Sequence, residues 1–205
     1  MNKIFIEAKK EETSECNFLK AILSAYFADK EYQFVCMNGV DNLFNETNRN
    51  QMALSVEDGD NIIVLLDADT QAKGVGFHKR LEDVNGKMSH FGIHFPLFLY
   101  PDNHSDGDVE NLMEELARKD LHKEWWDCFE DYEKCVSGIK KDGECRYILP
   151  NRKAKLHTYI SSQKLNNRTR DKIGSGQWLF NDNNFWDLTR PEVMPLIKFF
   201  KENLT

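Results

Sequence analysis

The sequence predicts an α/β protein, because short apolar runs of strand length alternate with segments of helical periodicity through its first half. The two most apolar runs are residues 61–66 (NIIVLL) and 95–100 (FPLFLY). Continuous apolar runs bounded by polar turns are typical of strands that are buried on both faces of a parallel sheet. Acidic residues follow several of these runs, and ligands bind beyond the carboxyl ends of parallel strands. We therefore expect a parallel sheet flanked by helices, with a site at one edge.

The elements of the first half follow in order from this alternation. We expect strands at residues 3–7, 32–37, 61–67 and 95–100, and helices at 13–28, 42–56 and 76–85. The first helix has apolar side chains at helical spacing, and either Thr13 or Ser14 is a suitable cap. Strands that alternate with helices imply parallel pairing through right-handed crossovers.

The second half predicts a mostly helical part, with helices near residues 107–119, 122–139, 151–162 and 191–203. In the second of these, the aromatic spacing is more typical of core packing than of a ligand site, and we expect Cys128 and Cys135 to be core thiols. The loop at 173–177 contains Gly174-Ser175-Gly176, which is weak evidence for phosphate binding because no strand precedes it. We expect an α/β core at 1–120 and a helical extension at 121–205, packed together as one unit.

Composition narrows the class of protein. The 205 residues are 40% hydrophobic, which suits one globular domain. No stretch approaches the roughly 20 apolar residues that cross a bilayer, and Glu7 comes too early for a signal peptide, so we expect a cytoplasmic protein without membrane contact. The net charge of −7 argues against a protein that coats nucleic acid nonspecifically.

Charge is unevenly distributed along the chain. Residues 101–145 hold fourteen Asp and Glu against six Lys and Arg, whereas residues 150–173 hold seven Lys and Arg against one acid. An acidic edge beside a basic segment suits a polyanionic substrate, although charge alone favours a solvated helix face. The candidates for nucleic-acid contact are Arg152, Lys153, Lys155, Arg168 and Arg170.

The acids at the strand ends predict a divalent metal site. Like charges gathered at one edge are costly unless cations bridge them, and Mg²⁺ or Mn²⁺ prefers oxygen ligands. We expect Glu7, Asp67 and Asp69 to hold one ion. The further candidate ligands are Glu11, Asp41, Asp102, Asp108 and Glu110. Capping offers a simpler explanation for some of them, because Asp41, Asp108 and Glu110 each stand near an expected helix start.

The order of these acids resembles the Toprim domain, the catalytic module of topoisomerases, bacterial primases, recombination-repair proteins and overcoming-lysogenization-defect nucleases. The matching segments are Glu7, Gly39-Val40-Asp41 and Asp67-Ala68-Asp69. Residues 98–110 (FLYPDNHSDGDVE) are similar to the hallmark of a Toprim-like bacterial family of unassigned function, and 126–129 and 185–188 are similar to further segments of it. The resemblance implies a Toprim-like Rossmannoid sheet that carries a divalent metal site.

The sequence departs from the Toprim pattern at two positions. Ala8 stands where Gly usually follows the first Glu, and Gln71 stands where a third acid is common. A second acid commonly follows the first, and Glu11 fits that place with Glu12 and Glu15 as rivals. The pattern does not fix the basic residue near the scissile phosphate, for which Lys155 and Lys73 are candidates.

These residue types predict a metal-dependent nuclease, because two ions about 3.5–4 Å apart can activate water and stabilise the leaving oxygen of a phosphodiester. The expected catalytic residues are Glu7, Asp67, Asp69 and Lys155. One alternative is a non-catalytic Toprim-like regulatory or binding protein that works as a homodimer or partner subunit, which the loss of Gly after Glu7 favours. Another is an Asp-x-Asp phosphatase of the haloacid-dehalogenase type with Asp67 as nucleophile, which leaves Glu7 and Asp41 unexplained.

Overall fold

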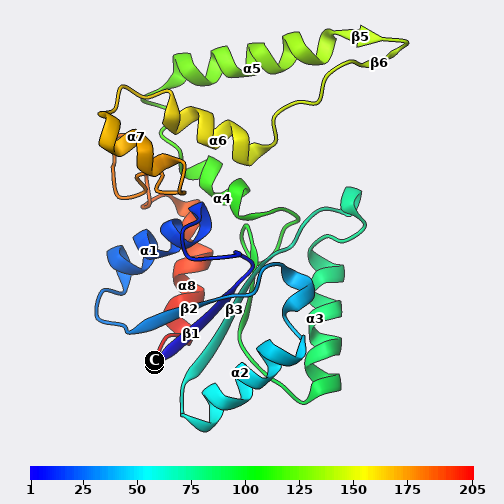
Figure 1. Ribbon diagram of the computed structural model, residues 1–205, viewed down its shortest axis with the longest axis vertical. Coiled ribbons are helices and arrows are strands. Elements are labelled where there is room, and N and C mark those ends of the chain that lie inside the picture. Colours follow the sequence, from blue (N-terminus) through cyan, green and yellow to red (C-terminus); the bar gives the residue numbers. More distant parts are fainter.

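The computed structural model describes residues 1–205 and contains a four-stranded parallel sheet in the order β2-β1-β3-β4 (Figure 1). Its strands are β1 (Asn2–Ile6), β2 (Tyr32–Cys36), β3 (Asn61–Asp67) and β4 (Leu97–Tyr100). The predicted parallel α/β sheet is therefore confirmed. The first and third strands are neighbours in the centre of the sheet, so their carboxyl ends meet at the same edge.

Helices cover both faces of the sheet. On one face lie α1 (Ser14–Tyr26) and α8 (Met194–Asn203), and on the other lie α2 (Glu46–Glu57) and α3 (Phe77–Phe91) (Figure 1). The alternation of side chains along β1 explains the two layers. Ile4 and Ile6 belong to the larger core beneath α1 and α8, whereas Phe5 points into the smaller core beneath α2 and α3.

Two predicted helices have different bounds in the structure. The segment predicted as one helix at 42–56 divides into a short 3₁₀ turn, η1 (Val40–Asn42), and α2, because Asn45 caps a new helix start. A second 3₁₀ turn, η2 (Gln71–Lys73), precedes α3. The α3 helix runs past residue 85 to Phe91 and ends where Gly92 adopts a left-handed conformation.

The second half is mostly helical, as predicted. Its elements are α4 (Val109–Leu116), α5 (Lys123–Gly138), β5 (Lys140–Lys141), β6 (Glu144–Cys145), α6 (Arg152–Ser161), α7 (Asn167–Ile173) and η3 (Pro191–Val193). The sequence analysis did not foresee α7 or the short β5–β6 hairpin. Figure 1 shows that the carboxyl edge of the sheet faces this helical part and that α5 and the hairpin project from it as an arm.

The arm is more exposed than the sequence predicted. Trp126 is buried on α5, but Tyr132 further along the helix is 48% exposed. Cys128 and Cys135 are exposed, so the prediction of core thiols was wrong. Because the arm leaves the body beyond its first turns, the apolar spacing of α5 does not correspond to a continuous buried face.

The C-terminal helix returns to the sheet. Phe199 packs against Phe98 of β4 and Phe200 against Phe27 after α1, with ring centroids 5.3 and 6.0 Å apart. The larger core of 36 buried residues includes side chains from before and after residue 120, so both parts of the chain share it. No helix is long and apolar enough to span a membrane.

Candidate functional site

Two of the predicted strand-end acids lie against each other. Ile6 of β1 pairs with Leu65 of β3. Glu7 directly follows Ile6, and Asp67 is the last residue of β3, two residues after Leu65. The Glu7 Oε1 atom accepts a hydrogen bond of 2.8 Å from the backbone N–H of Asp67. The Asp67 Oδ1 atom in turn accepts one of 2.9 Å from the N–H of Val109, at the start of α4. The end of β1, the end of β3 and the start of α4 thus meet at this pair.

Two further acids complete what we call the acid cluster, which consists of Glu7, Glu15, Asp67 and Glu110. Glu15 lies in the first turn of α1 and is 8% exposed, and Glu110 lies in the first turn of α4 and is 9% exposed. One cation pairs with a carboxylate of the cluster, since Lys153 Nζ of α6 lies 2.9 Å from Glu110 Oε1. Arg80 Nε donates to the backbone oxygen of Asp67 at 3.3 Å.

The acid cluster carries too little positive charge to keep its carboxylates ionised easily. Burial raises the pKa of Glu7. Burial, followed by the charges of Glu7, Glu15 and Glu110, raises the pKa of Asp67 well above its usual range. Burial together with Glu7 and Glu110 raises the pKa of Glu15 to about 8. The cluster is therefore a place where an added cation would relieve repulsion.

Asp69 stands beside the cluster but is paired with two cations. Its two carboxylate oxygens each lie 2.6 Å from a nitrogen, one of Lys73 and one of Arg80. Asp69 has a left-handed φ of 59°, and its backbone exchanges two hydrogen bonds with Gly107. The predicted metal ligand Asp69 is thus held in an ion-paired network, with both oxygens occupied.

The structure does not bring Glu11, Asp41 or Asp102 into the acid cluster. Glu11 pairs with Lys20 at 2.9 Å on the surface, and Asp41 is exposed in η1. Asp102 accepts hydrogen bonds from the N–H groups of two following residues and so closes a turn.

Asp108 is the N-cap of α4, where it forms a capping box with Asn111. Capping, the simpler of the two explanations considered for this acid, matches its position. Glu110 stands in the first turn of the same helix.

The predicted nucleic-acid contacts are mostly engaged with protein carboxylates. Arg152 Nε lies 2.8 Å from Glu114 Oε2. Lys155 Nζ lies 3.5 Å from Glu114 and 3.4 Å from Glu133, and it also stands 5.2 Å from the centre of the Trp126 ring. The predicted catalytic lysine thus joins α4, α5 and α6, away from the acid cluster.

Arg168 and Arg170 are exposed on α7. Lys153, predicted from the sequence as a nucleic-acid contact, instead pairs with a carboxylate of the acid cluster.

Sequence reasoning gave Glu15 too little weight. Thr13 caps α1 by accepting a hydrogen bond from Cys16 N–H, so the helix begins at Ser14. That cap leaves Glu11 outside the helix and places Glu15 in its first turn, facing the sheet edge. The capping signal of Thr13 was the available clue.

The donors in the cluster are of the type that Mg²⁺ and Mn²⁺ prefer, since all four are carboxylates. As the side chains stand, however, no three His, Cys, Asp or Glu residues are placed so that they could hold a metal ion. Metal binding therefore requires carboxylates to turn from their present partners, such as Glu110 from Lys153.

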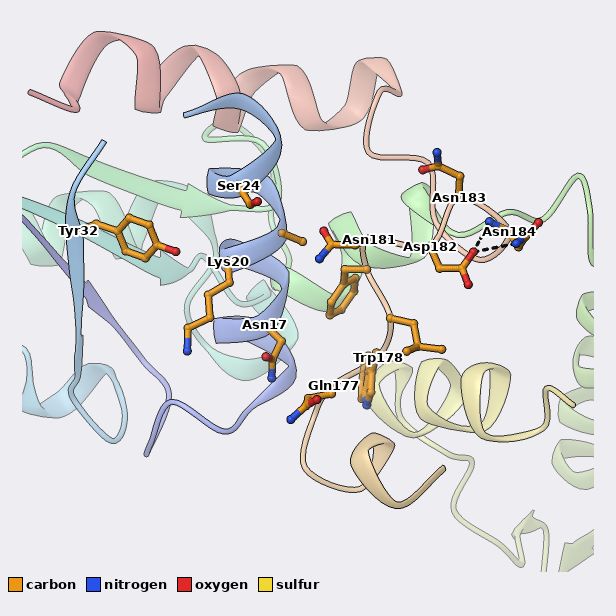
Figure 2. A pocket seen from close by; sticks show the side chains of 13 residues that line it. Asn17, Lys20, Ser24, Tyr32, Gln177, Trp178, Asn181, Asp182, Asn183 and Asn184 are labelled. Atoms are coloured by element: carbon orange, nitrogen blue, oxygen red, sulfur yellow. Dashed lines mark hydrogen bonds between the residues drawn. The ribbon is translucent and has the colours of Figure 1, made fainter. Parts of the chain in front are cut away.

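A separate hollow of about 790 Å³ lies between α1 and residues 177–184 (Figure 2). Its lining is rich in amides, including Asn17, Gln177 and Asn181, and also contains Lys20. None of the acid cluster lines it. The hollow is therefore lined mainly by polar side chains, and it is distinct from the acid cluster.

Comparison with known proteins gives one match. No curated protein and no solved structure matches the chain. The model of the family described as "Protein of unknown function (DUF3226)" matches residues 2–205. Because that match covers almost the whole sequence, the chain belongs to the DUF3226 family.

Proposed function

We propose that this chain is a Toprim-like, divalent-metal-dependent nuclease that hydrolyses phosphodiester bonds in DNA or RNA in the cytoplasm. The observation that carries the proposal is the hydrogen bond between the Glu7 carboxylate and the Asp67 backbone at the carboxyl edge of the sheet. Ligand sites in open parallel sheets form at this edge. The two acids that the Toprim resemblance implies as metal ligands are therefore neighbours.

Charge supports the same proposal. The acid cluster has four buried or partly buried carboxylates, and one of them, Glu110, pairs with Lys153. Carboxylates that share a site cannot all ionise without a compensating cation. Mg²⁺ or Mn²⁺ supplies that compensation with oxygen ligands, and its binding would return Glu7, Glu15 and Asp67 to their charged forms.

Each residue of the site has a separate role in the proposed hydrolysis. A bound metal would supply the activation of water and the stabilisation of the leaving oxygen of the phosphodiester. Glu7 and Asp67 would hold it, and Glu15 and Glu110 would be further oxygen donors. Lys153 is placed to attract a phosphate oxygen when Glu110 turns to the metal, because its ammonium reaches the cluster from α6. Asp69 is positioned by Arg80, which keeps it at the edge of the site.

A second candidate function is a non-catalytic binding or regulatory protein on the same scaffold, acting as a homodimer or partner subunit. The ion pairs favour it. Asp69 is satisfied by Lys73 and Arg80, and Arg152 and Lys155 are satisfied by Glu114, so groups that a nuclease would use already have partners.

A cleavage assay separates the two functions. Purified protein is incubated with single- and double-stranded DNA and RNA in Mg²⁺ or Mn²⁺, and with a phosphomonoester. The proposal expects nucleic-acid cleavage that Asp67→Asn abolishes and that Glu11→Gln, a change of the same kind outside the cluster, leaves intact. Metal binding without turnover supports the regulatory function, and turnover of the phosphomonoester supports the phosphatase.

A further inference from the structure

A hollow of about 480 Å³ lies beside the acid cluster, between the first turns of two helices. Thr13 and Ser14 line it from the start of α1, and Asn151 and Lys153 line it from the start of α6. Residues 173–178 close the third side. The volume lies within the range of small-ligand sites.

Both helices begin beside this hollow, and each has backbone N–H groups in its first turn that donate to no protein atom. In α1, the cap Thr13 satisfies Cys16, but the N–H groups of Ser14 and Glu15 donate to no protein atom. In α6, the cap Asn151 satisfies Ala154, and the first two N–H groups of the helix are likewise free. The N-terminus of a helix carries a partial positive charge and binds anions, and here two such ends converge.

A buried hydroxyl in the same lining also lacks a partner. Ser14 is 2% exposed, and its Oγ atom makes no hydrogen bond within the protein. Buried polar groups in folded proteins are nearly always hydrogen-bonded, so an orphan beside a hollow points to a missing ligand. A ligand with several acceptor oxygens would satisfy this hydroxyl and the free N–H groups together.

The glycine loop fits closely over the start of α1. Gly176 has a φ of +79°, and a side chain there would overlap with the backbone of Thr13 and Ser14. A Gly-x-Gly sequence alone is weak evidence for phosphate binding. Here the loop forms one wall of the hollow, and the absence of a side chain at Gly176 lets that wall pack against the start of α1.

Side-chain charge favours an anion on the side that faces α6. Lys153 and His157 line the hollow there, and Lys153 also contacts Glu110 of the acid cluster. Glu12 lies on the opposite rim, where its nearest cation is Lys10 at 3.9 Å. The net arrangement is two helix ends and two basic side chains around one exposed carboxylate.

We propose that this hollow binds a phosphate group, and that in the nuclease it holds a substrate phosphate next to the one that reacts. The second clause rests on the proposed function, since Lys153 joins the hollow to the acid cluster. Phosphate supplies the acceptor oxygens that Ser14 Oγ and the free N–H groups lack. The contacts are to the backbone of the nucleic acid and so carry no sequence preference.

The test is a titration of the metal-free protein with inorganic phosphate, followed by the amide NMR signals. The amides of Ser14, Glu15, Arg152 and Lys153 should shift saturably with one Kd. Ser14→Ala and His157→Gln should each raise that Kd about tenfold, as expected for one hydrogen bond to a charged group. Lys198→Gln, which removes an exposed charge on α8, should leave it unchanged.

The melting temperature of Ser14→Ala shows whether a change in phosphate affinity comes from a folding defect. Ser14→Ala removes a hydroxyl that has no partner in the protein, so its melting temperature should not fall. A purely structural role for Ser14 predicts unchanged phosphate affinity, and that result would overturn the proposal, as would the absence of saturable shifts at these amides. If the protein binds phosphate but cleaves no nucleic acid, the phosphate site is supported and the proposed nuclease function is contradicted.

Discussion

Glu7 at the end of β1 accepts a hydrogen bond of 2.8 Å from the backbone N–H of Asp67 at the end of β3, although 60 residues separate them in sequence. The pairing of β1 with β3 in the centre of the sheet produces this contact. Asp67 also accepts the N–H of Val109, so the start of α4 is held at the same point. Changes at Asp67 therefore report directly on the acid cluster.

Replacing Asp67 by Asn should make the metal-free protein more stable. The Asn side chain keeps an oxygen for the Val109 N–H, and it removes an ionisable group whose pKa is raised by burial and by the neighbouring acids, so that folding no longer has to suppress its charge. We expect a gain of about 1 kcal/mol in the free energy of unfolding, or roughly 2–4 °C in melting temperature. Differential scanning calorimetry in chelator measures it, and a loss of stability would contradict the excess of charge in the cluster.

Divalent metal should stabilise the wild-type protein and not the Asp67→Asn variant. A ligand that binds only the native state adds about 2.7 kcal/mol when its free concentration is about 100 times Kd. Melting in Mg²⁺ and in chelator gives the difference for each protein. Glu11→Gln is the matched control, because Glu11 pairs with Lys20 outside the cluster and its variant should keep the full gain.

The metal-free protein should lose stability as pH rises from acid to mildly alkaline. Glu15 has a pKa of about 8 in the folded state against 4.5 ordinarily, so the folded protein holds a proton that the unfolded chain has lost. The free energy of unfolding falls across this window by up to about 1.4 kcal/mol per pH unit for this group and is level above it. Urea unfolding at several pH values should show the decline.

The Glu15→Gln variant should flatten that decline, because its side chain has no proton to lose. Burial raises the pKa of Glu7 and of Asp67 in the same direction, so part of the pH dependence should remain. A variant with the full wild-type slope would show that Glu15 does not carry the effect.

The loop over α1 offers a matched pair of glycine substitutions. Gly176→Ala should destabilise the protein by about 2 kcal/mol or more, since Gly176 is left-handed and a side chain overlaps with the backbone of Thr13 and Ser14. Gly174→Ala should be neutral or slightly stabilising, because Gly174 has a φ of −59° and an added side chain would meet only the Asp171 carbonyl oxygen, at 3.9 Å. Equal effects of the two changes in a denaturant titration would contradict the close approach.

Lys153 and Lys155 should differ in what their loss affects. Lys155 stands against the Trp126 ring and between two carboxylates, so Lys155→Ala should lower stability by about 1–2 kcal/mol. At a temperature where both variants are folded, Lys153→Ala should slow cleavage and Lys155→Ala should not. A loss of cleavage confined to Lys155→Ala would restore the role that the sequence suggested for it.

The sequence predicts the sheet well because the information is local. Apolar runs mark the strands, and the crossover rule makes them parallel, so the acids that follow β1 and β3 share an edge. The contact between Glu7 and Asp67 also requires β1 and β3 to be neighbours, and this strand order is known from the structure. By contrast, Asp41 follows the edge strand β2 and Glu11 precedes the cap of α1, and neither reaches the centre of the edge.

The remaining parts of the site depend on packing between distant segments. Lys153 and Lys155 are two residues apart on α6 and therefore point to nearly opposite faces. Which lysine meets the acids is decided by how α6 docks on α4, where Arg152 and Lys155 both reach Glu114. Amino-acid composition shows only that residues 150–173 are basic. It does not show that α6 forms ion pairs with α4.

The measurement that tests the central claim most directly is anomalous diffraction from a crystal of the protein soaked in Mn²⁺. The account predicts a metal peak at the carboxyl edge of the sheet, with carboxylate oxygens of both Glu7 and Asp67 at about 2.1 Å, the distance typical of small divalent ions. A peak bound instead by Glu11, Asp41 or Asp102, or an acid cluster that stays free of metal in saturating Mn²⁺, would contradict it.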